Sequence, residues 1–209
     1  AAETKSPSFL AVHPNQRFLY AVGEATTLEG QRSGGVSAFA LDQRTGKLSF
    51  LNQQPSGGLG PCHLDVDRSG RCLLVANYGS GSIASLPVRK DGSLGEPAST
   101  IQHAGSSVNP QRQAGPHAHF ITPDPADRFA LCCDLGLDQV LVCRLDAKRA
   151  TFSPNDPPFA TVRAGAGPRH LAFRPDGRFL FVVNELASSL TAFAYDARRG
   201  VLREVETVS

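Results

Sequence analysis

The chain has 209 residues, with 21 Lys and Arg against 19 Asp and Glu, so its charge is nearly balanced. It has no basic block, which argues against a nucleic-acid partner, and no apolar run near the roughly 18 residues of a membrane-spanning helix. The chain is long enough to bury a sizeable core, which predicts one or two domains.

The cysteines form no C-x-x-C motif, and each lies in or beside a strand-like run of apolar residues. Reduced, mostly buried thiols fit this pattern and favour a reducing compartment, so we expect a cytoplasmic location. The chain contains no Met, which indicates a processed chain or a fragment. The cysteines are Cys62, Cys72, Cys132, Cys133 and Cys143.

The first predicted element is a β-hairpin that begins at Phe9, and the same pattern recurs three times along the chain. Each copy has two short apolar runs separated by a polar turn, with an Arg directly after the turn. The copies are spaced by about 50 to 60 residues, which is the range of repeat architectures. The four arginines that mark the copies are Arg17, Arg71, Arg128 and Arg178.

A third strand-like run and a weaker fourth run follow each hairpin. Four short strands in a unit of about 50 residues are the signature of a β-propeller blade. We therefore predict an all-β fold, a β-propeller of four-stranded antiparallel blades, as one domain over residues 1–209. An all-β sandwich is the alternative, although sandwiches do not repeat a four-strand unit this regularly. The repeats are expected at about 8–59, 60–114, 115–166 and 167–209.

Charged side chains stand at the open end of the fourth hairpin. Arg169 and His170 begin its first strand, and Glu185 follows its second, so equal distances from the turn place them together. The first strand of a propeller blade lines the central channel, so these residues are expected to belong to a polar ring at one end of that channel. The corresponding positions in the second and third repeats are His63, Asn77, His117, His119 and Asp134.

His117 and His119 are two residues apart, which predicts that they share one face of a strand. With Asp134 they could bind a metal, but no third His or paired carboxylate stands at a matching depth, so no metal site is predicted. One catalytic or substrate-binding His and one structural His fit better. A plain salt bridge between Arg169 and Glu185 is the structural alternative to an active site.

The longest connection between repeats, residues 104–116, is rich in Ser, Asn, Pro and Gln and leads directly into His117. It is either a flexible surface loop or a segment that folds over the channel mouth, where Gln111 and Arg112 would hold an anionic group. His13 and His103 are expected at surface or turn positions.

Six segments of the chain carry a family resemblance: GPCHLDVDRSG, VANYGSGSI, GSSVNPQRQAGPHAHF, CDLGLDQV, GAGPRHLAFRPDGRF and VNELASSL. They are similar to the lactonase family of seven-bladed β-propellers, which includes cycloisomerase-type 6-phosphogluconolactonases and is related to carboxy-muconate cyclase. The resemblance implies about four blades of an expected seven and a central active site built on a His, an Arg and a Glu. By motif these are His117 or His119, Arg169 and Glu185.

The resemblance also implies hydrolysis of a sugar lactone, with 6-phosphogluconolactone as the expected substrate and no cofactor. Glu185 would act as general base, Arg169 would bind the carbonyl oxygen and a His would donate a proton, although acid and base could be exchanged. The rival functions are a carboxy-muconate-type cycloisomerase and a non-catalytic propeller scaffold. The expected substrate-binding residues are His63, Asn77, Gln111, Arg112, Asp134 and His170.

Overall fold

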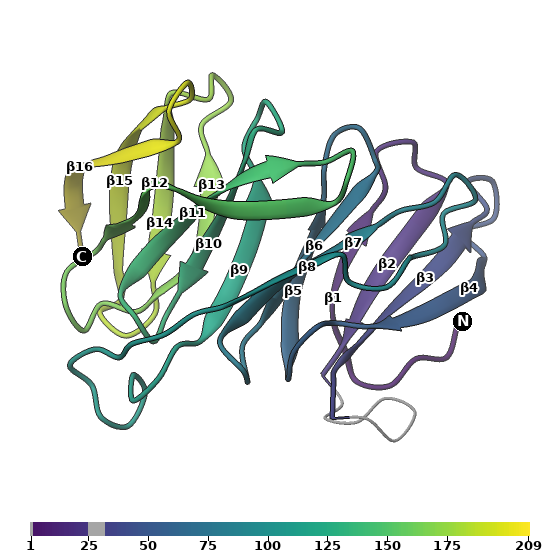
Figure 1. Cartoon of the computed structure of the whole chain (residues 1–209), viewed down its shortest axis with the longest axis horizontal. Coiled ribbons are helices and arrows are strands. Elements are labelled where there is room, and N and C mark those ends of the chain that lie inside the picture. The colour runs from purple at the N-terminus through teal and green to yellow at the C-terminus, as the bar shows by residue number, and fades with distance from the viewer. Residues whose placement is uncertain (1, 25–31) are drawn as a thin grey trace.

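The computed structural model of the chain describes residues 2–24 and 32–209. Over these residues it consists of four separate antiparallel sheets, each with four strands in sequence order (Figure 1). The prediction of four-stranded blades, four in number, is therefore confirmed. No helix in the described part of the chain is long and apolar enough to cross a membrane.

The four sheets follow one another along the chain, and we refer to them as blades one to four. Blade one comprises β1 (Pro7–Val12), β2 (Phe18–Gly23), β3 (Gly35–Leu41) and β4 (Leu48–Pro55). Blade two comprises β5 (Pro61–Val66), β6 (Cys72–Asn77), β7 (Ser82–Pro87) and β8 (Ser99–Gln102). Blade three comprises β9 (Ala118–Pro123), β10 (Phe129–Asp134), β11 (Gln139–Asp146) and β12 (Thr151–Thr161). Blade four comprises β13 (Pro168–Phe173), β14 (Phe179–Asn184), β15 (Ser189–Asp196) and β16 (Val201–Val208).

The blades stand side by side in chain order, with the two termini at opposite ends of the molecule (Figure 1). The first strand of each blade packs against the first strand of the next, so β1, β5, β9 and β13 form an inner row. This is the arrangement of propeller blades around an axis, and it brings the starts of the four inner strands to the same end of the molecule.

An apolar cluster fills each of the three interfaces between neighbouring blades. Each sheet has apolar side chains that the next sheet must cover. In β2, for example, Tyr20 and Val22 are buried against Leu73 and Val75 of blade two. All five cysteines are unpaired, with Cys62 half-buried and the other four buried, as the sequence pattern indicated.

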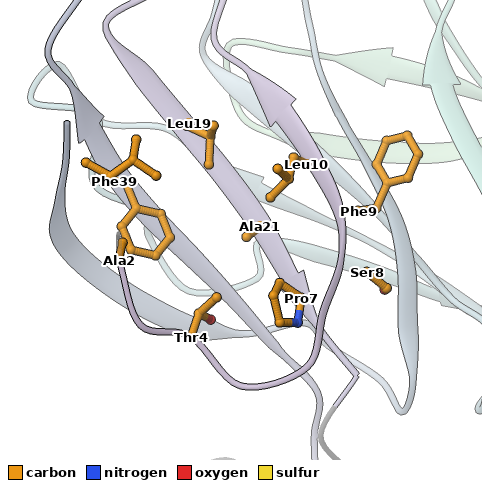
Figure 2. Close-up of a pocket in the computed structure, with 10 residues that line it drawn as sticks. Ala2, Thr4, Pro7, Ser8, Phe9, Leu10, Leu19, Ala21 and Phe39 are labelled. Atoms are coloured by element: carbon orange, nitrogen blue, oxygen red, sulfur yellow. The ribbon is translucent and has the colours of Figure 1, made fainter. Parts of the chain in front are cut away.

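Among the residues that the structure describes, no sheet packs on the outer faces of the two terminal blades. On blade one, Leu10, Val12 and Phe50 are 54, 51 and 60 % exposed. A hollow of about 500 Å³ lies on the same face, with Leu10, Leu19 and Phe39 among its lining residues (Figure 2). Blade four likewise exposes Phe181, Val183, Leu190, Val205 and Val208.

We expect residues 1–209 on their own to self-associate, because both terminal blades present apolar side chains and unpaired sheet edges to water. Sedimentation velocity should show oligomers that grow with protein concentration. The double substitution Phe50→Asp and Phe181→Asp, one on each outer face, should shift the distribution toward monomer. A wild-type chain that sediments as a monodisperse monomer and melts cooperatively would show that four blades suffice.

Candidate active site

Three of the inner strands begin with a β-bulge at the same level. In β5, β9 and β13, two consecutive residues oppose a single residue of the neighbouring strand, and β1 has irregular pairing between Pro7 and Leu10. The extra residues are Cys62, His119 and Arg169. A bulge re-aims a side chain relative to strict strand alternation, so it decides which residues reach this end of the molecule.

One residue further along the inner strands, four rings pack against one another. The ring of His63 lies 4.1 Å from the rings of Phe9 and Phe120, and the rings of Phe120 and His170 are 5.0 Å apart. His63 is 3 % exposed, and burial, reinforced by His170, lowers its pKa to about 3. The structure therefore places His63 as a neutral, buried ring inside this packing.

Glu185 is held by two guanidinium groups. Arg169 Nε forms an ion pair with Glu185 Oε2 at 2.8 Å, and Arg112 Nη2 donates a hydrogen bond to Glu185 Oε1 at 2.6 Å. Burial alone would raise the pKa of the carboxyl, but the hydrogen bond and charge of Arg112, together with Arg169 and His119, hold its pKa below the ordinary value. The proximity of Arg169 and Glu185 expected from the hairpin is present, and Glu185 is a carboxylate at neutral pH.

Arg112 reaches this cluster from the connection 104–116. Asn109 Oδ1 accepts the backbone N–H groups of Gln111 and Arg112, both at 3.1 Å, and the next residue, Gln113, is completely buried. Of the two alternatives for this connection, the segment that folds over the inner-strand ends is the one observed. The guanidinium of Arg112 reaches Glu185, whereas the side chain of Gln111 is exposed.

Tyr78 lies between the two histidines of the PHAH motif. Its ring stacks on His117, with centroids 4.4 Å apart, and meets His119 nearly edge-on at 5.5 Å. The expected common strand face of His117 and His119 is wrong, because β9 begins only at Ala118 and the bulge at His119 interrupts alternation. Burial, followed by the charge of Arg169, lowers the pKa of His119, so this imidazole is neutral at pH 7.

Asn77 and Asp134 were expected to occupy the position of Glu185 in their own blades, but they occupy the position one residue earlier, that of Asn184. They end β6 and β10, as Asn184 ends β14, and all three side chains are turned into the blades, with at most 1 % exposed. The residue that corresponds to Glu185 in blade two is therefore Tyr78 rather than Asn77. The structure places Asn77 and Asp134 beneath the candidate site, where neither is open to a substrate.

Asp134 is a buried carboxylate that accepts hydrogen bonds from residues next to the candidate site. Its Oδ1 accepts the backbone N–H groups of His117 at 2.8 Å and of Gly136 at 3.0 Å, and its Oδ2 lies 2.6 Å from His103 Nδ1. The expected surface position of His103 is wrong, because its side chain is buried as the partner of this carboxylate. Within the described ranges, no group of three or more His, Cys, Asp or Glu side chains is placed to hold a metal ion.

His13 lies in the turn between β1 and β2, as expected, but its side chain is buried rather than exposed. It is 8 % exposed, and its Nε2 lies 2.9 Å from the carbonyl oxygen of Gly70, which links the turn of blade one to that of blade two. Nothing in the local pattern around His13 distinguishes such a contact between blades from an ordinary turn residue.

Tyr78 is the main residue of the site that sequence reasoning missed. The signal that could have found it is the alignment of the turns NYGSGS, DLGLDQ and NELASS, which begin at Asn77, Asp134 and Asn184. In that alignment Tyr78 occupies the same place as Glu185.

The site therefore combines a carboxylate, two guanidinium groups and a neutral imidazole at one end of the inner strands. Such groups can polarise a carbonyl, stabilise an oxyanion and transfer a proton. Fold and site together define a propeller with a His, Arg and Glu centre of the kind suited to carbonyl chemistry.

The chain belongs to the lactonase family: the family model described as "Lactonase, 7-bladed beta-propeller" matches residues 1–209. It is 36 % identical over 209 residues to the 6-phosphogluconolactonase of Bacillus subtilis (strain 168), covering 100 % of this chain and 57 % of that relative.

Two solved structures are also similar. A protein from Bacteroides fragilis NCTC 9343 matches with a TM-score of 0.92 and 34 % identity, covering 100 % of this chain and 58 % of that one. The Pseudomonas aeruginosa periplasmic gluconolactonase PpgL matches with a TM-score of 0.87 and 33 % identity, covering 99 % and 58 %. The chain thus spans a little over half the length of the relatives that it matches.

We expect His63 to make the protein sensitive to acid. Its pKa is about 3 when folded and near the ordinary 6.5 when unfolded, so the unfolded state binds the proton first as the pH falls. The contribution to stability is complete above pH 6.5 and is lost as the pH falls toward 3. His63→Phe keeps an aromatic ring in the packing with Phe9 and Phe120 but removes the titrating group. In this variant, calorimetry should show a smaller decrease of Tm between pH 6.5 and 4 than in the wild type.

The matched control is Phe120→Leu, which disturbs the same packing without removing a titrating group. It should lower Tm by a similar amount at every pH. A His63→Phe variant whose Tm falls with acid as steeply as that of the wild type would contradict the assignment.

Proposed function

We propose that the protein hydrolyses a sugar lactone and that 6-phosphogluconolactone is its substrate. The observation that carries the proposal is the clamp of Arg112, Glu185 and Arg169 beside the neutral ring of His119. The names of two relatives at 36 and 33 % identity, a 6-phosphogluconolactonase and a gluconolactonase, support the same reaction class.

In the proposed reaction, Arg169 stabilises the oxyanion. Water adds to the lactone carbonyl, and negative charge develops on its oxygen in the tetrahedral intermediate. Arg169 contacts Glu185 through Nε, and its side chain is 46 % exposed. The rest of the guanidinium can therefore approach a bound carbonyl. A charged donor aimed at a developing oxyanion is among the strongest contributions to such catalysis.

His119 is the proposed general base. Its pKa lies below the ordinary 6.5, so at neutral pH its imidazole is a free base, whereas both oxygens of the Glu185 carboxylate are engaged by guanidinium groups. It takes a proton from the attacking water and returns it to the ring oxygen as the C–O bond breaks. The base role expected for Glu185 moves to His119 in this proposal, and Glu185 orients both guanidinium groups and stabilises the imidazolium.

Arg112 is proposed to bind the phosphate of the substrate. Its side chain is 43 % exposed, and a guanidinium matches the oxygen geometry of a phosphate. Gln111, exposed on the same turn, is proposed to contact the sugar hydroxyls together with the half-buried His170.

The unphosphorylated lactone is the second candidate substrate, because one similar structure is described as a gluconolactonase. A substrate panel on the protein in its natural length separates these functions. Hydrolysis of 6-phosphogluconolactone above the spontaneous rate, and faster than that of gluconolactone, is the expected result. Turnover of a muconolactone alone would favour the cycloisomerase, and no turnover of any lactone would favour the scaffold. The cytoplasmic location stays a prediction, since that same relative is described as periplasmic.

We expect substitutions in the site to lower kcat while Tm stays within a few degrees of the wild type. Arg169→Ala removes an oxyanion donor and should cost about 10²–10³ in kcat. His119→Gln removes the base and should cost about 10²–10⁴. Stopped-flow measurement of proton release, corrected for spontaneous hydrolysis, gives these rates.

The pH profile distinguishes the two candidate bases. The acid limb of kcat/KM should follow the ionisation of His119, so that the rate falls as the imidazole is protonated below pH 6.5. That limb should persist in Glu185→Gln and disappear in His119→Gln. The control is His117→Gln, which changes the other ring that packs on Tyr78 and should keep the limb. Loss of the limb in Glu185→Gln alone would return the base role to Glu185.

A further inference from the structure

A second carboxylate, outside the clamp, connects the segments that carry it. Asp138 lies in the turn between β10 and β11 and is 3 % exposed. Its two oxygens accept four hydrogen bonds, all from uncharged donors. The donors are Ser107 Oγ at 2.5 Å, Gln113 Nε2 at 2.8 Å, and the backbone N–H groups of Gly165 and Gly167, each at 2.7 Å.

These four donors belong to the two segments that deliver the arginines of the clamp. Gln113 directly follows Arg112, and Gly167 stands two residues before Arg169. The carbonyl oxygen of Gly167 also accepts the backbone N–H of Glu185 at 2.8 Å. Arg112 and Arg169 are therefore within two residues of a hydrogen-bond donor to Asp138, and Glu185 is hydrogen-bonded to the backbone of one such donor residue, Gly167.

The connection that bears Arg112 is tied to Asp138 through a fully buried amide. Gln113 Nε2 also donates to the carbonyl oxygen of Leu135 at 2.9 Å, and Gln113 Oε1 accepts the backbone N–H of Asn109 at 3.1 Å. A buried carboxylate or amide is stable only when its hydrogen bonds are made, so this network has one low-energy arrangement.

The backbone at Asp138 adopts a conformation that is uncommon for residues other than glycine. Its φ is +56°, a conformation that favours glycine, and the corresponding turn position of blade two is Gly81 with φ +62°. Asp138 adopts this conformation while its carboxylate is buried and fully paired. A residue without those four hydrogen bonds would serve the turn alone at least as well.

We propose that Asp138 is a positioning residue, which sets the two arginine-bearing segments at the separation that lets both guanidinium groups reach Glu185. It touches neither the substrate nor the reacting atoms and acts through Arg112 and Arg169. The catalytic part of this inference rests on the proposed lactone hydrolysis, whereas the effect on the clamp does not.

Asp138→Asn tests the inference in the protein in its natural length. The amide keeps the size of the side chain but turns one acceptor oxygen into a donor, so at least one of the two backbone N–H groups, of Gly165 or of Gly167, loses its acceptor. Misplacement of the clamp should lower kcat/KM for 6-phosphogluconolactone by about 10-fold to 100-fold. The matched control is Asp124→Asn in the turn between β9 and β10 of the same blade.

Asp124 is 1 % exposed and accepts the backbone N–H groups of Arg128 and Phe129 and the hydroxyl of Tyr195. Both substitutions break buried hydrogen bonds and should lower Tm comparably. Only Asp138→Asn should reduce the activity of the folded protein. An equal loss of kcat/KM in both variants, or in neither, would overturn the inference.

A double-mutant cycle with Arg112→Gln tests whether Asp138 acts through the clamp. If it does, Asp138→Asn should reduce kcat/KM by a smaller factor when Arg112 is already absent. Factors that simply multiply in the double variant would contradict a positioning role.

A readout that needs no activity is the titration of the Glu185 carboxyl, followed by carbon-13 NMR. The charged and titratable groups that face Glu185 are Arg112 from the connection, Arg169 from β13 and His119 from β9. Loosening the clamp in Asp138→Asn should raise the pKa of Glu185 toward its ordinary value, whereas Asp124→Asn should leave it unchanged. An unchanged titration in folded Asp138→Asn would overturn the inference.

If Asp138→Asn does not fold, Ser107→Ala removes one of the four donors and leaves the carboxylate otherwise paired. It should move the titration of Glu185 and kcat/KM in the same directions by smaller amounts, and no movement in either would overturn the inference. A wild-type protein that hydrolyses no lactone would instead remove the proposed function, while the NMR titration would still decide the role of Asp138.

Discussion

The β-bulge near the start of the inner strands is the constraint on which the candidate site depends. In a regular strand, consecutive side chains point to opposite faces of the sheet, and a bulge breaks this alternation. The bulge in β13 sends the guanidinium of Arg169 to Glu185, 2.8 Å away, while the ring of His170 packs 5.0 Å from that of Phe120. The same device in β9 aims His119 at this cluster. The inner row thus carries a close-packed layer of rings with charged groups directly above it.

Buried carboxylates hold the segments around that layer. Asp134 fixes the entry to β9 through the N–H of His117, and Asp138 fixes the connection to Arg112 and the approach to Arg169. Both come from the single turn DLGLD, which makes this turn of blade three the structural support of a site assembled mostly from its neighbours. An isolated buried charge is costly, so these aspartates are stable only with their donors in place, and the donors are ordered in turn.

The clamp also explains how the charged groups divide the work in the proposed reaction. A carboxylate between two guanidinium groups is a weak base, which suits Glu185 to orientation rather than proton transfer. The partly buried His119 is neutral at pH 7, because burial and the charge of Arg169 lower its pKa. In the proposed reaction, binding, oxyanion stabilisation and proton transfer thus belong to separate residues on separate strands and loops.

The sequence by itself determined the repeated four-strand blade, because alternating apolar residues and polar turns act over a few residues and recur at each repeat. It also determined the meeting of Arg169 and Glu185, since hairpin partners can be counted outward from their turn. Only the tertiary structure decided the contact of Arg112 with Glu185, which joins residues 73 positions apart, and the place of Tyr78 against His117. The packing of one blade on the next and the path of a long connection create these contacts, and no local pattern encodes either. For the same reason the burial of His13 and His103 and the role of Asp138 emerged only with the folded chain, whereas the level of Asn77 and Asp134 follows from aligning the turns that begin at Asn77, Asp134 and Asn184.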